Sequence, residues 1–366
     1  MTQNTDHYFA VIMAGGIGER FWPMSRTSRP KQFIDILGTG KSLIRQTYER
    51  FLEVLPKERI YVITNERFKN LVSEHIPGIT DDRIICEPTR KNTGPCIAYA
   101  SWKIHNLDPE AKLVIAPSDH IILKEHAFAQ VIKSALQAAS EHDWLLTLGI
   151  TPSRPDTGYG YIQYKNGNPW PANPNLKKVK TFTEKPNIEL AESFVKSGDF
   201  LWNSGIFIWS AKAIIDAFEK FQPEISYVFR EASHIYNTPK EETYMQTAFA
   251  TCKSISIDYA IMEKADNVYV FVSEFGWSDL GTWGSLFEVR QKDEYQNAVM
   301  GKNVLLYDVN NCIVNIPDEK LVVLQGLQDY IIAESDNALL ICQKENEQEM
   351  RRFVNDIRIQ KGENFT

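Results

Sequence analysis

The sequence has no long apolar run, no paired-cysteine pattern and no stretch dense in basic residues. Its five cysteines are an odd number, lie far apart and form no C-x-x-C: Cys86, Cys96, Cys252, Cys312 and Cys342. This distribution argues against a disulfide framework and fits free thiols in a reducing cytoplasm. No apolar stretch is long enough to cross a bilayer, and the polar segment Met1–His7 lacks the apolar core of a signal peptide.

The charge balance is acidic, with a formal net charge of −7. Proteins that bind nucleic acids are more often basic, so we expect neither a nucleic-acid nor a membrane partner. The composition, 43% hydrophobic and 24% charged, is typical of a soluble globular protein. A chain of 366 residues favours two domains, or one large α/β domain with an appendage.

Short apolar runs alternate with amphipathic helical patterns through the first half of the chain. This alternation predicts a Rossmann-like α/β fold, with an open, mixed but mostly parallel sheet flanked by helices. Ligands of such sheets bind outside the carboxyl ends of the strands. The expected strands are residues 8–13, 60–64, 113–116 and 145–149, and the expected helices include residues 44–55, 96–104 and 128–139.

The pattern changes twice further along the chain. Residues 150–275 mix strand-like runs with helices and a loop at 166–175 rich in proline, asparagine and glycine, which is typical of an insertion or lid. After about residue 296, short strands follow at nearly regular spacing, separated by polar turns. This predicts a small β-array or partial β-helix, followed by an amphipathic helix at about Glu345–Ile359, with a packing or oligomerisation role.

A glycine turn directly follows the first expected strand, at Ala14-Gly15-Gly16-Ile17-Gly18. It is not a dinucleotide fingerprint, because Phe21 occupies the third glycine position. A Walker A loop fails as well, because the first glycine position before Gly40-Lys41-Ser42 is Asp35. The glycines alone fit a plain strand-to-helix turn.

The residues that follow the turn favour a phosphate-binding role. Arg20 and Lys31 are the cations that would neutralise a polyphosphate beside exposed backbone N–H groups. Pro23 and Pro30 would hold the loop open and extended, so that both cations converge on one site. Two cations near one glycine turn are costly without an anion to pair with. The segment therefore predicts a nucleoside triphosphate cradle.

The whole pattern G-G-x-G-x-R-x-x-P-x-x-x-x-x-x-P-K resembles the signature of the sugar nucleotidyltransferases, the nucleoside-diphosphate-sugar pyrophosphorylases. Phe21-Trp22-Pro23, Ser25-Arg26 and Pro30-Lys31-Gln32-Phe33 are similar to the mannose-1-phosphate guanylyltransferases of that family in particular. The resemblance implies the nucleotide-diphospho-sugar transferase fold in a cytoplasmic enzyme. It also implies transfer of GMP from GTP to α-D-mannose 1-phosphate, giving GDP-mannose and diphosphate, with Mg²⁺ as cofactor.

The same resemblance implies which residues bind the nucleotide. Glu87, Asn92 and Thr93 lie in an E-P-x-x-x-N-T-x-P segment that in the family helps to hold the base, although Asn92 and Thr93 also suit a helix cap. Guanine offers an acceptor and two donors on one edge, so an acid and an amide suit it. The expected nucleotide-binding set is Ala14, Gly15, Gly16, Gly18, Glu87, Asn92, Thr93 and Ser118, and the expected catalytic cations are Arg20, Lys31 and Lys185.

Two aspartates are implied as Mg²⁺ ligands. Asp119, in A-P-S-D-H, ends an expected buried strand, where a carboxylate is well placed to hold a cation that prefers oxygen ligands and phosphates. Asp279 lies in W-S-D-L-G-T-W, which resembles the second metal motif of the family. A helix cap is the alternative role for each aspartate, and their pairing rests on the resemblance. We expect His120 to orient the loop or to pack.

Three further motifs resemble the sugar-phosphate half of the family's site. They are T-G-Y-G-Y-I, F-T-E-K-P and L-W-N-S-G-I-F, and the segment I-D-Y-A-I-M-E is added with less support. A solvated surface pair is the alternative for Glu184-Lys185. The implied sugar-phosphate residues are Gly160, Glu184, Lys185, Asn203, Gly205 and Asp258.

The resemblance spans roughly residues 8–285 and implies a division of the chain. We predict a catalytic domain at 1–295, with a nucleotide-binding half (1–150) and a sugar-phosphate half (151–295), then the β-array and helix at 296–366. We also predict a homodimer and, because the chain ends before a cupin domain would fit, a monofunctional enzyme. Two alternatives stay open. One is the same chemistry on another pair, such as UTP or dTTP with glucose 1-phosphate, or a heptose phosphate. The other is a non-catalytic regulatory homologue that binds a nucleotide sugar.

Overall fold

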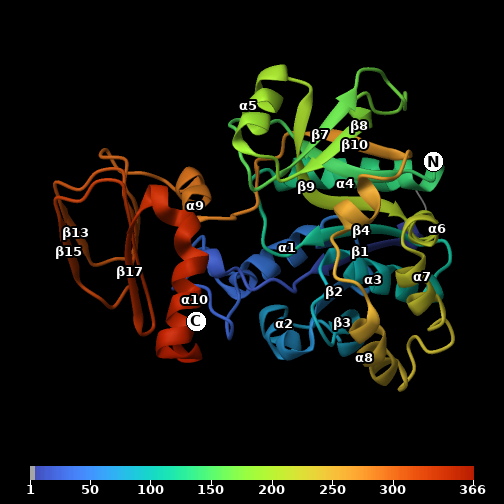
Figure 1. Ribbon diagram of the computed structural model, residues 1–366, viewed down its shortest axis with the longest axis horizontal. Coiled ribbons are helices and arrows are strands. Elements are labelled where there is room, and N and C mark those ends of the chain that lie inside the picture. Colours follow the sequence, from blue (N-terminus) through green and yellow to red (C-terminus); the bar gives the residue numbers. More distant parts are fainter. Residues whose placement is uncertain (1–4) are drawn as a thin grey trace. The chain divides into compact units, whose positions relative to one another are not determined.

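The computed structural model describes residues 5–366, so residues 1–4 of the segment Met1–His7 lie outside the described part. The chain forms two compact units (Figure 1). Unit 1 holds residues 5–15 with Gln46–Ser118 and Ile122–Trp277, and unit 2 holds Gly16–Arg45, Asp119–Ile121 and Ser278–Thr366. These packing units are interleaved in the sequence. The predicted functional division at 295/296 is a different kind of boundary and stays a prediction.

Unit 1 is built on one nine-stranded mixed sheet. Its order is β3-β2-β1-β4-β9-β6-β10-β8-β7, and seven strands run one way while β8 and β9 run the other way. The predicted mostly parallel sheet is confirmed. The strands are β1 (Tyr8–Met13), β2 (Ile60–Asn65), β3 (Ile84–Glu87), β4 (Lys112–Pro117), β6 (Leu145–Ile150), β7 (Gly160–Lys165), β8 (Leu176–Glu184), β9 (Phe200–Ser210) and β10 (Val268–Ser273).

Helices cover both faces of this sheet. On one face, Phe9 and Val11 join a large core cluster with residues of α3, α6 and α7. On the other, α4 packs against β4, β6, β9 and β10, and none of its residues belongs to that cluster. The helices are α1 (Leu43–Leu52), which begins in unit 2, and α2 (Lys69–His75), α3 (Thr93–Leu107), α4 (Glu125–Glu141), α5 (Ile188–Ser197), α6 (Ala211–Phe221), α7 (Pro223–Arg230) and α8 (Glu241–Thr251).

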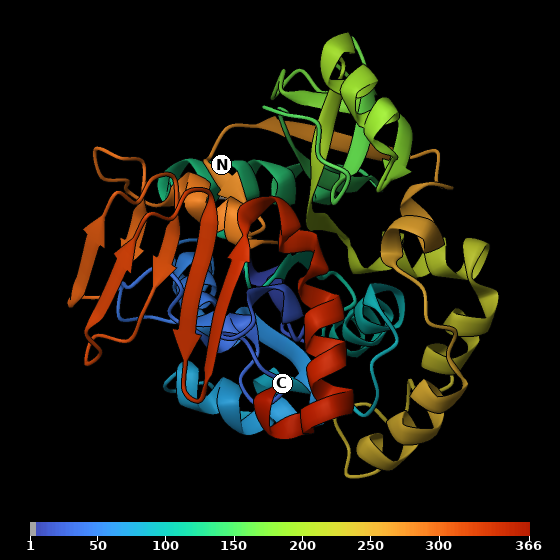
Figure 2. The same ribbon diagram turned by 60° about the vertical axis from the view of Figure 1, so that its left-hand side comes forward.

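The carboxyl-terminal part of unit 2 is a short parallel β-array, as predicted (Figure 2). Ala298 pairs with Ile313, and Ile313 pairs with Ile331, so successive coils stack in register. Alternate side chains serve two cores, because Ile313 and Val314 belong to different clusters. The strands are β12 (Ala298–Met300), β13 (Val304–Tyr307), β14 (Ile313–Asn315), β15 (Val322–Gln325), β16 (Tyr330–Ser335) and the antiparallel β17 (Ala338–Gln343).

Two helices and the signature loop pack on this array. Met350 and Val354 of α10 (Met350–Lys361) and Trp283 of α9 (Trp283–Val289) share a cluster with Phe21 and Trp22. The predicted terminal helix begins later than expected, because residues Lys344–Glu349 form a 3₁₀ segment before α10. The remaining short strands, β5 (Ile121–Ile122) and β11 (Trp277–Ser278), lie where the chain passes from one unit to the other.

Two properties of the described chain complete the fold. All five cysteines are free thiols. No helix among residues 5–366 combines the length and apolar character that a membrane span requires.

A buried charged network ties α3 to α8 and yields a stability prediction. The Glu241 carboxylate accepts hydrogen bonds from Lys103 Nζ at 2.6 Å, Tyr99 Oη at 2.7 Å and the Asn237 backbone N–H at 2.7 Å. Removing one partner of a buried ion pair strands the other charge. We expect Glu241→Gln to lower the free energy of unfolding by about 3 kcal/mol, measured by urea denaturation.

The exposed pair Lys69–Asp81, joined at 2.8 Å, supplies the control. Asp81→Asn should leave the unfolding midpoint nearly unchanged, because water screens that pair. Equal midpoints for the two variants would contradict the importance assigned to the buried network.

Candidate active site

The signature loop of residues 16–33 folds back on itself in unit 2. Gly18 has a positive φ of 74°, and a Cβ at this position would lie 2.5 Å from Lys31 Cβ, so only glycine fits. The Lys31 N–H donates to the Ile17 carbonyl at 3.2 Å, and Ser25 Oγ donates to the Gly18 carbonyl at 2.6 Å. The loop is therefore compact, with short 3₁₀ segments at Glu19–Phe21 and Lys31–Phe33, and the expected extended loop is wrong.

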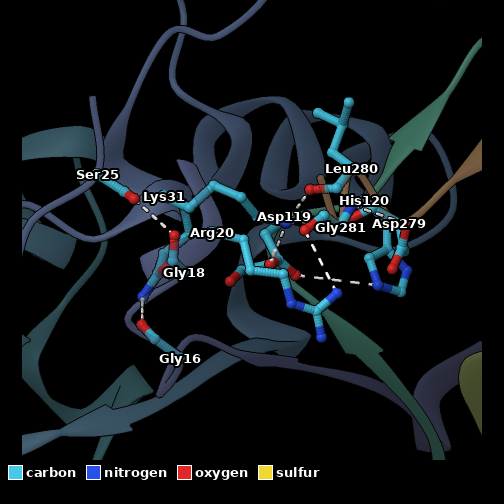
Figure 3. Close-up of polar contacts among 12 residues, drawn as sticks. Gly16, Gly18, Arg20, Ser25, Lys31, Asp119, His120, Asp279, Leu280 and Gly281 are labelled. Carbon is cyan, nitrogen blue, oxygen red and sulfur yellow. Dashed lines mark hydrogen bonds and ion pairs between the residues drawn. The ribbon is translucent and has the colours of Figure 1, made fainter. Parts of the chain in front are cut away.

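Lys31 is the centre of the charged cluster in unit 2 (Figure 3). The residue is only 4% exposed. Nζ donates to the carbonyls of Asp279 at 2.9 Å and Leu280 at 3.0 Å, and pairs with Asp119 Oδ2 at 2.7 Å. These three partners match the three donors of an ammonium group. An anion of the chain itself, Asp119, thus balances this cation, which the sequence argument did not foresee.

This arrangement brings together two aspartates that are far apart in the sequence. Lys31 contacts the side chain of Asp119 and the backbone of Asp279 at once. The Asp279 carboxylate accepts the Gly281 N–H at 2.8 Å, while His120 Nε2 lies 3.9 Å from Asp119 Oδ1. Burial acts to raise the pKa of Asp119, but the charges of Lys31 and His120 outweigh it and hold that pKa below its usual value.

Arg20 lies beside this cluster. Its Nη1 makes one long hydrogen bond to the Gly281 carbonyl at 3.5 Å, and no other protein partner of the guanidinium is seen within residues 5–366. A Cβ on Gly16 would have no neighbouring heavy atom within 4 Å. The Gly16 carbonyl accepts a hydrogen bond from Gln32 Nε2 at 2.9 Å. Arg20 is therefore the more accessible of the two predicted cations, and Lys31 the buried one.

The other predicted nucleotide residues belong to unit 1. Backbone hydrogen bonds join the ends of neighbouring strands there: the Ala14 N–H donates to Ile63 at 2.8 Å, and the Ser118 N–H donates to Met13 at 3.0 Å. Thr64 Oγ1 donates to the Ala14 carbonyl at 2.8 Å. Residues 14, 15 and 118 thus meet at the carboxyl edge of the parallel strands, as the sequence predicts.

Glu87 reaches this edge from the end of β3. A Cβ on Gly15 would lie 3.5 Å from Glu87 Oε2, so the carboxyl group is next to the glycine turn. The residue is 4% exposed, and its Oε1 has no hydrogen-bond partner among the described residues. Burial raises the pKa of Glu87 to about 8. The group is therefore largely protonated near neutral pH and lacks a partner for one oxygen.

Asn92 and Thr93 begin α3 in the way that their alternative role predicts. Asn92 has a φ of 68°, and its Oδ1 accepts the Thr93 N–H at 2.8 Å. Thr93 Oγ1 accepts the Ile257 N–H at 2.9 Å. The capping role is seen directly, and it also ties this segment to the residue before Asp258. Contact with a base stays a prediction.

The predicted sugar-phosphate residues gather around the paired strands β7 and β8. Gly160 lies opposite Glu184 in the register, and a Cβ there would lie 2.5 Å from Glu184 Oε2. The glycine thus leaves the space that this carboxylate occupies. Lys185, which has a φ of 48° and an exposed side chain, forms an ion pair with Glu184. The pair is therefore half-buried, because only the lysine faces solvent.

Asn203 links this pair to Asp258. Its Nδ2 donates to Asp258 Oδ1 at 3.0 Å, and its Oδ1 accepts the Gly205 N–H at 3.2 Å. Gly205 has a φ of 70°, as expected for a glycine at this bend. Burial, then the charge of Glu184, raise the pKa of Asp258 to about 7. Asp258 therefore holds its proton more strongly than an ordinary aspartate does.

Thr147 is a member of this network that the sequence did not single out. It is fully buried in β6, 3.0 Å from both Asn203 Oδ1 and the Ile206 carbonyl. A threonine inside an apolar strand carries no signal of this kind, because its partners lie on β9, more than fifty residues away in the sequence.

The carboxylates of the unit 2 cluster suit the expected Mg²⁺ only if a substrate supplies further ligands. No group of three or more His, Cys, Asp and Glu side chains suited to a metal occurs in residues 5–366. Two carboxylates, Asp119 and Asp279, are nevertheless a sufficient protein share for Mg²⁺, which keeps water and takes phosphate oxygens as its other ligands.

Two models of known protein families match this chain. The nucleotidyl transferase family model matches residues 9–296. A second model, the mannose-phosphate isomerase/GMP-like β-helix domain, matches residues 301–357. This chain belongs to the nucleotidyl transferase family.

Several relatives of this nucleotidyl transferase carry the name mannose-1-phosphate guanylyltransferase. It is 36% identical over 347 residues to a mannose-1-phosphate guanylyltransferase of Klebsiella pneumoniae, covering 94% of this chain and 72% of that one. A putative mannose-1-phosphate guanylyltransferase of Vibrio cholerae is 34% identical, with 96% and 74% covered.

Solved structures include a similar fold. A Thermus thermophilus protein described as a mannose-1-phosphate geranyltransferase has a crystal structure that aligns with a TM-score of 0.86 and 28% identity. The alignment covers 96% of this chain and 99% of that one. The predicted family and fold class are confirmed, whereas the role of each site residue stays a prediction.

The contact between Gly160 and Glu184 gives a test of the nucleotidyl transferase site. In Gly160→Ala the new methyl group must displace the Glu184 carboxylate. We expect KM for the sugar phosphate to rise roughly tenfold, a cost typical of a misplaced binding group, while KM for the nucleotide stays within about twofold. Steady-state kinetics with each substrate varied in turn measures both.

A double-mutant cycle supplies the control. Glu184→Asp shortens the carboxylate side chain, so the double variant should lose less than the sum of the two single variants. Strict additivity would mean that Gly160 acts independently of Glu184.

Proposed function

We propose that this protein transfers GMP from GTP to α-D-mannose 1-phosphate and releases diphosphate. The observation that carries the proposal is the Lys31 cluster. One buried ammonium holds Asp119 and the backbone of Asp279 together, in the motifs that resemble the family's metal-binding segments. The names of the relatives at 34–36% identity support mannose 1-phosphate and a guanylyl group as substrates.

The chemistry needs alignment and charge neutralisation more than proton transfer. The nucleophile is a phosphate oxygen of the sugar phosphate, already ionised at neutral pH, so no side-chain nucleophile or strong base is required. Arg20 would pair with the triphosphate and favour departure of diphosphate. Lys185, exposed at the end of β8, would orient the attacking phosphate in line with the α-phosphorus.

Asp119 and Asp279 would hold Mg²⁺. When bound, that ion would neutralise the charge that develops on the phosphates. Lys31 contributes differently from Arg20, because its donors are occupied by protein oxygens. A phosphate contact with Lys31 requires one of these oxygens to leave. We expect the Asp119 carboxylate to leave, because it is the partner of Lys31 that could bind Mg²⁺ instead.

Glu87 and the segment at Asn92 and Thr93 would recognise guanine. Gly160, Glu184, Asn203, Gly205 and Asp258 would surround the sugar and its phosphate. We further propose that the protein works in the cytoplasm and forms a homodimer, with the residues after 296 in a packing or oligomerisation role.

A second candidate keeps the reaction but changes the substrates. The carboxyl pair of Glu184 and Asp258 binds hydroxyl groups without specifying mannose, so glucose or heptose phosphates, and UTP or dTTP, stay alternatives. A non-catalytic regulatory homologue is less well supported, because Arg20, Lys31, Asp119 and Asp279 are all present.

One assay separates these possibilities. Purified protein is mixed with GTP, UTP, dTTP or ATP and with mannose, glucose or a heptose 1-phosphate, and diphosphate release is followed with Mg²⁺ and with EDTA. We expect turnover with GTP and mannose 1-phosphate that EDTA abolishes. Preference for another pair would reassign the substrates, and absence of turnover with every pair would favour the regulatory homologue.

The two lysines give a prediction about division of labour. Lys31→Ala and Lys185→Ala should each lower kcat/KM by a factor that corresponds to roughly 2–4 kcal/mol of lost transition-state stabilisation. For Lys31→Ala the loss should appear in kcat/KM for GTP. For Lys185→Ala it should appear in kcat/KM for mannose 1-phosphate. Lys112→Ala, which removes a lysine that contacts Glu110, serves as control. Equal losses on both substrates for either variant would oppose this division.

Glu87 gives a pH prediction. An ionised carboxylate accepts the two donors on the guanine edge, so base binding should favour the ionised form of a group whose pKa is about 8. Below that pH, binding must release a proton, and GTP affinity should rise about tenfold per pH unit between about pH 6 and 8, then level off.

Glu87→Gln should remove this pH dependence, and isothermal titration with GTP and with ATP at several pH values measures it. The ATP series corrects for titration of the triphosphate itself. An affinity that falls as the pH rises towards 8 would mean that the protonated acid donates to the base.

A further inference from the structure

Arg26 belongs to the signature but does not face the charged cluster. It is 9% exposed, although it is one of four cations between residues 20 and 31. A buried guanidinium has five donors and needs acceptors for them. The position of those acceptors therefore shows what this part of the signature contacts.

The acceptors lie at the turn between β16 and β17. Arg26 Nη2 donates to the Ser335 carbonyl at 2.9 Å, and Nη1 donates to Asn337 Oδ1 at 2.8 Å. Nη1 also contacts the Asn364 carbonyl at 3.3 Å, and Asp336 Oδ2 lies 3.8 Å from Nε. Within the loop, Nε reaches the Pro23 carbonyl at 3.4 Å.

Two other contacts join the same loop to the end of the described chain. Trp22 Nε1 donates to the Phe365 carbonyl at 2.7 Å, and Arg358 Nη2 pairs with Glu19 Oε1 at 3.4 Å. Trp22 is also buried in the cluster that contains Met350 and Val354 of α10. The loop that carries Gly18, Arg20 and Lys31 is thus held at three successive points, Glu19, Trp22 and Arg26.

We propose that the β16–β17 turn and the segment after α10 position the nucleotide-binding loop, with Arg26 as a positioning residue that acts through the loop. The carboxyl-terminal array then has a part in nucleotide binding, beyond a packing or oligomerisation role. The functional half of this inference rests on the proposed function, whereas the structural half does not.

The geometry requires arginine at position 26. Two separate nitrogens of the planar fork donate to the Ser335 carbonyl and the Asn337 side chain, whereas an ammonium group has one nitrogen and lacks this fork geometry. Loss of these contacts would free the far end of the loop. Displacements of about 1 Å at a binding site can cost up to about a hundredfold in rate.

Asn337→Ala is the principal test variant. Asn337 is exposed in a two-residue turn, so its truncation leaves the fold intact while removing one acceptor of Arg26. Asn337→Asp keeps an acceptor oxygen at the same place. The matched control is Asn346→Ala, another exposed asparagine of unit 2, which contacts Gln343 and not the loop. Arg26→Lys tests whether the planar guanidinium group is needed, because it keeps the positive charge and removes the second donating nitrogen.

Two measurements are made on the full chain. Hydrogen–deuterium exchange without substrates should show faster exchange of residues 16–33 in Asn337→Ala and Arg26→Lys, and wild-type exchange in Asn337→Asp and Asn346→Ala. Steady-state kinetics should show KM for GTP raised roughly three- to tenfold in Asn337→Ala, with KM for mannose 1-phosphate unchanged.

The outcomes separate the two proposals. Unchanged exchange of residues 16–33 in both Asn337→Ala and Arg26→Lys overturns the positioning inference, as does faster exchange with an unaltered KM for GTP. If the wild type shows no turnover but exchange responds as expected, the proposed function fails and the structural link stands. Equal changes in both KM values would indicate a general loss of folded protein and would also overturn the inference.

Discussion

The buried ammonium of Lys31 is the interaction on which the charged cluster of unit 2 depends. It joins three segments that are distant in sequence: the signature loop, the segment after β4 and the turn before α9. Burying a charge is costly unless it is paired and hydrogen-bonded. Here one carboxylate and two carbonyls meet that requirement. The same contacts bring two aspartates into one cluster, so one structural ion pair also assembles the candidate metal-binding groups.

Two carboxyl groups of unit 1 that belong to the predicted binding residues are buried in a different way. Glu87 and Asp258 are buried without a full cationic partner, and burial raises the pKa of each towards or above neutrality. Strongly shifted pKa values of this kind are characteristic of binding sites, where polar groups await a ligand. Two chemically distinct regions result. The charge of Lys31 is paired within the protein, whereas Glu87 and Asp258 stay only partly satisfied.

Local patterns in the sequence predicted much of the fold. The strand at Tyr8–Met13 has the predicted bounds, and the regular spacing of short strands after residue 296 indicated the β-array. The sequence did not indicate that β9 runs antiparallel between β4 and β6, because strand order depends on contacts between distant segments. Arg26 shows the same limit within the site. Its position in the motif did not indicate its partners, because the acceptors of its two Nη atoms lie more than three hundred residues further along the chain.

The short hairpin between β16 and β17 has a consequence for how this sequence can change. Surface turns usually accept insertions, because nothing else depends on their length. This two-residue turn instead presents a carbonyl and an amide at fixed positions to a buried guanidinium. One added residue in the turn would move the Asn337 side chain away from its place beside the Ser335 carbonyl. Among related sequences, the length of this hairpin should therefore vary far less than its exposure suggests, and a change in length should occur together with loss of the arginine at position 26.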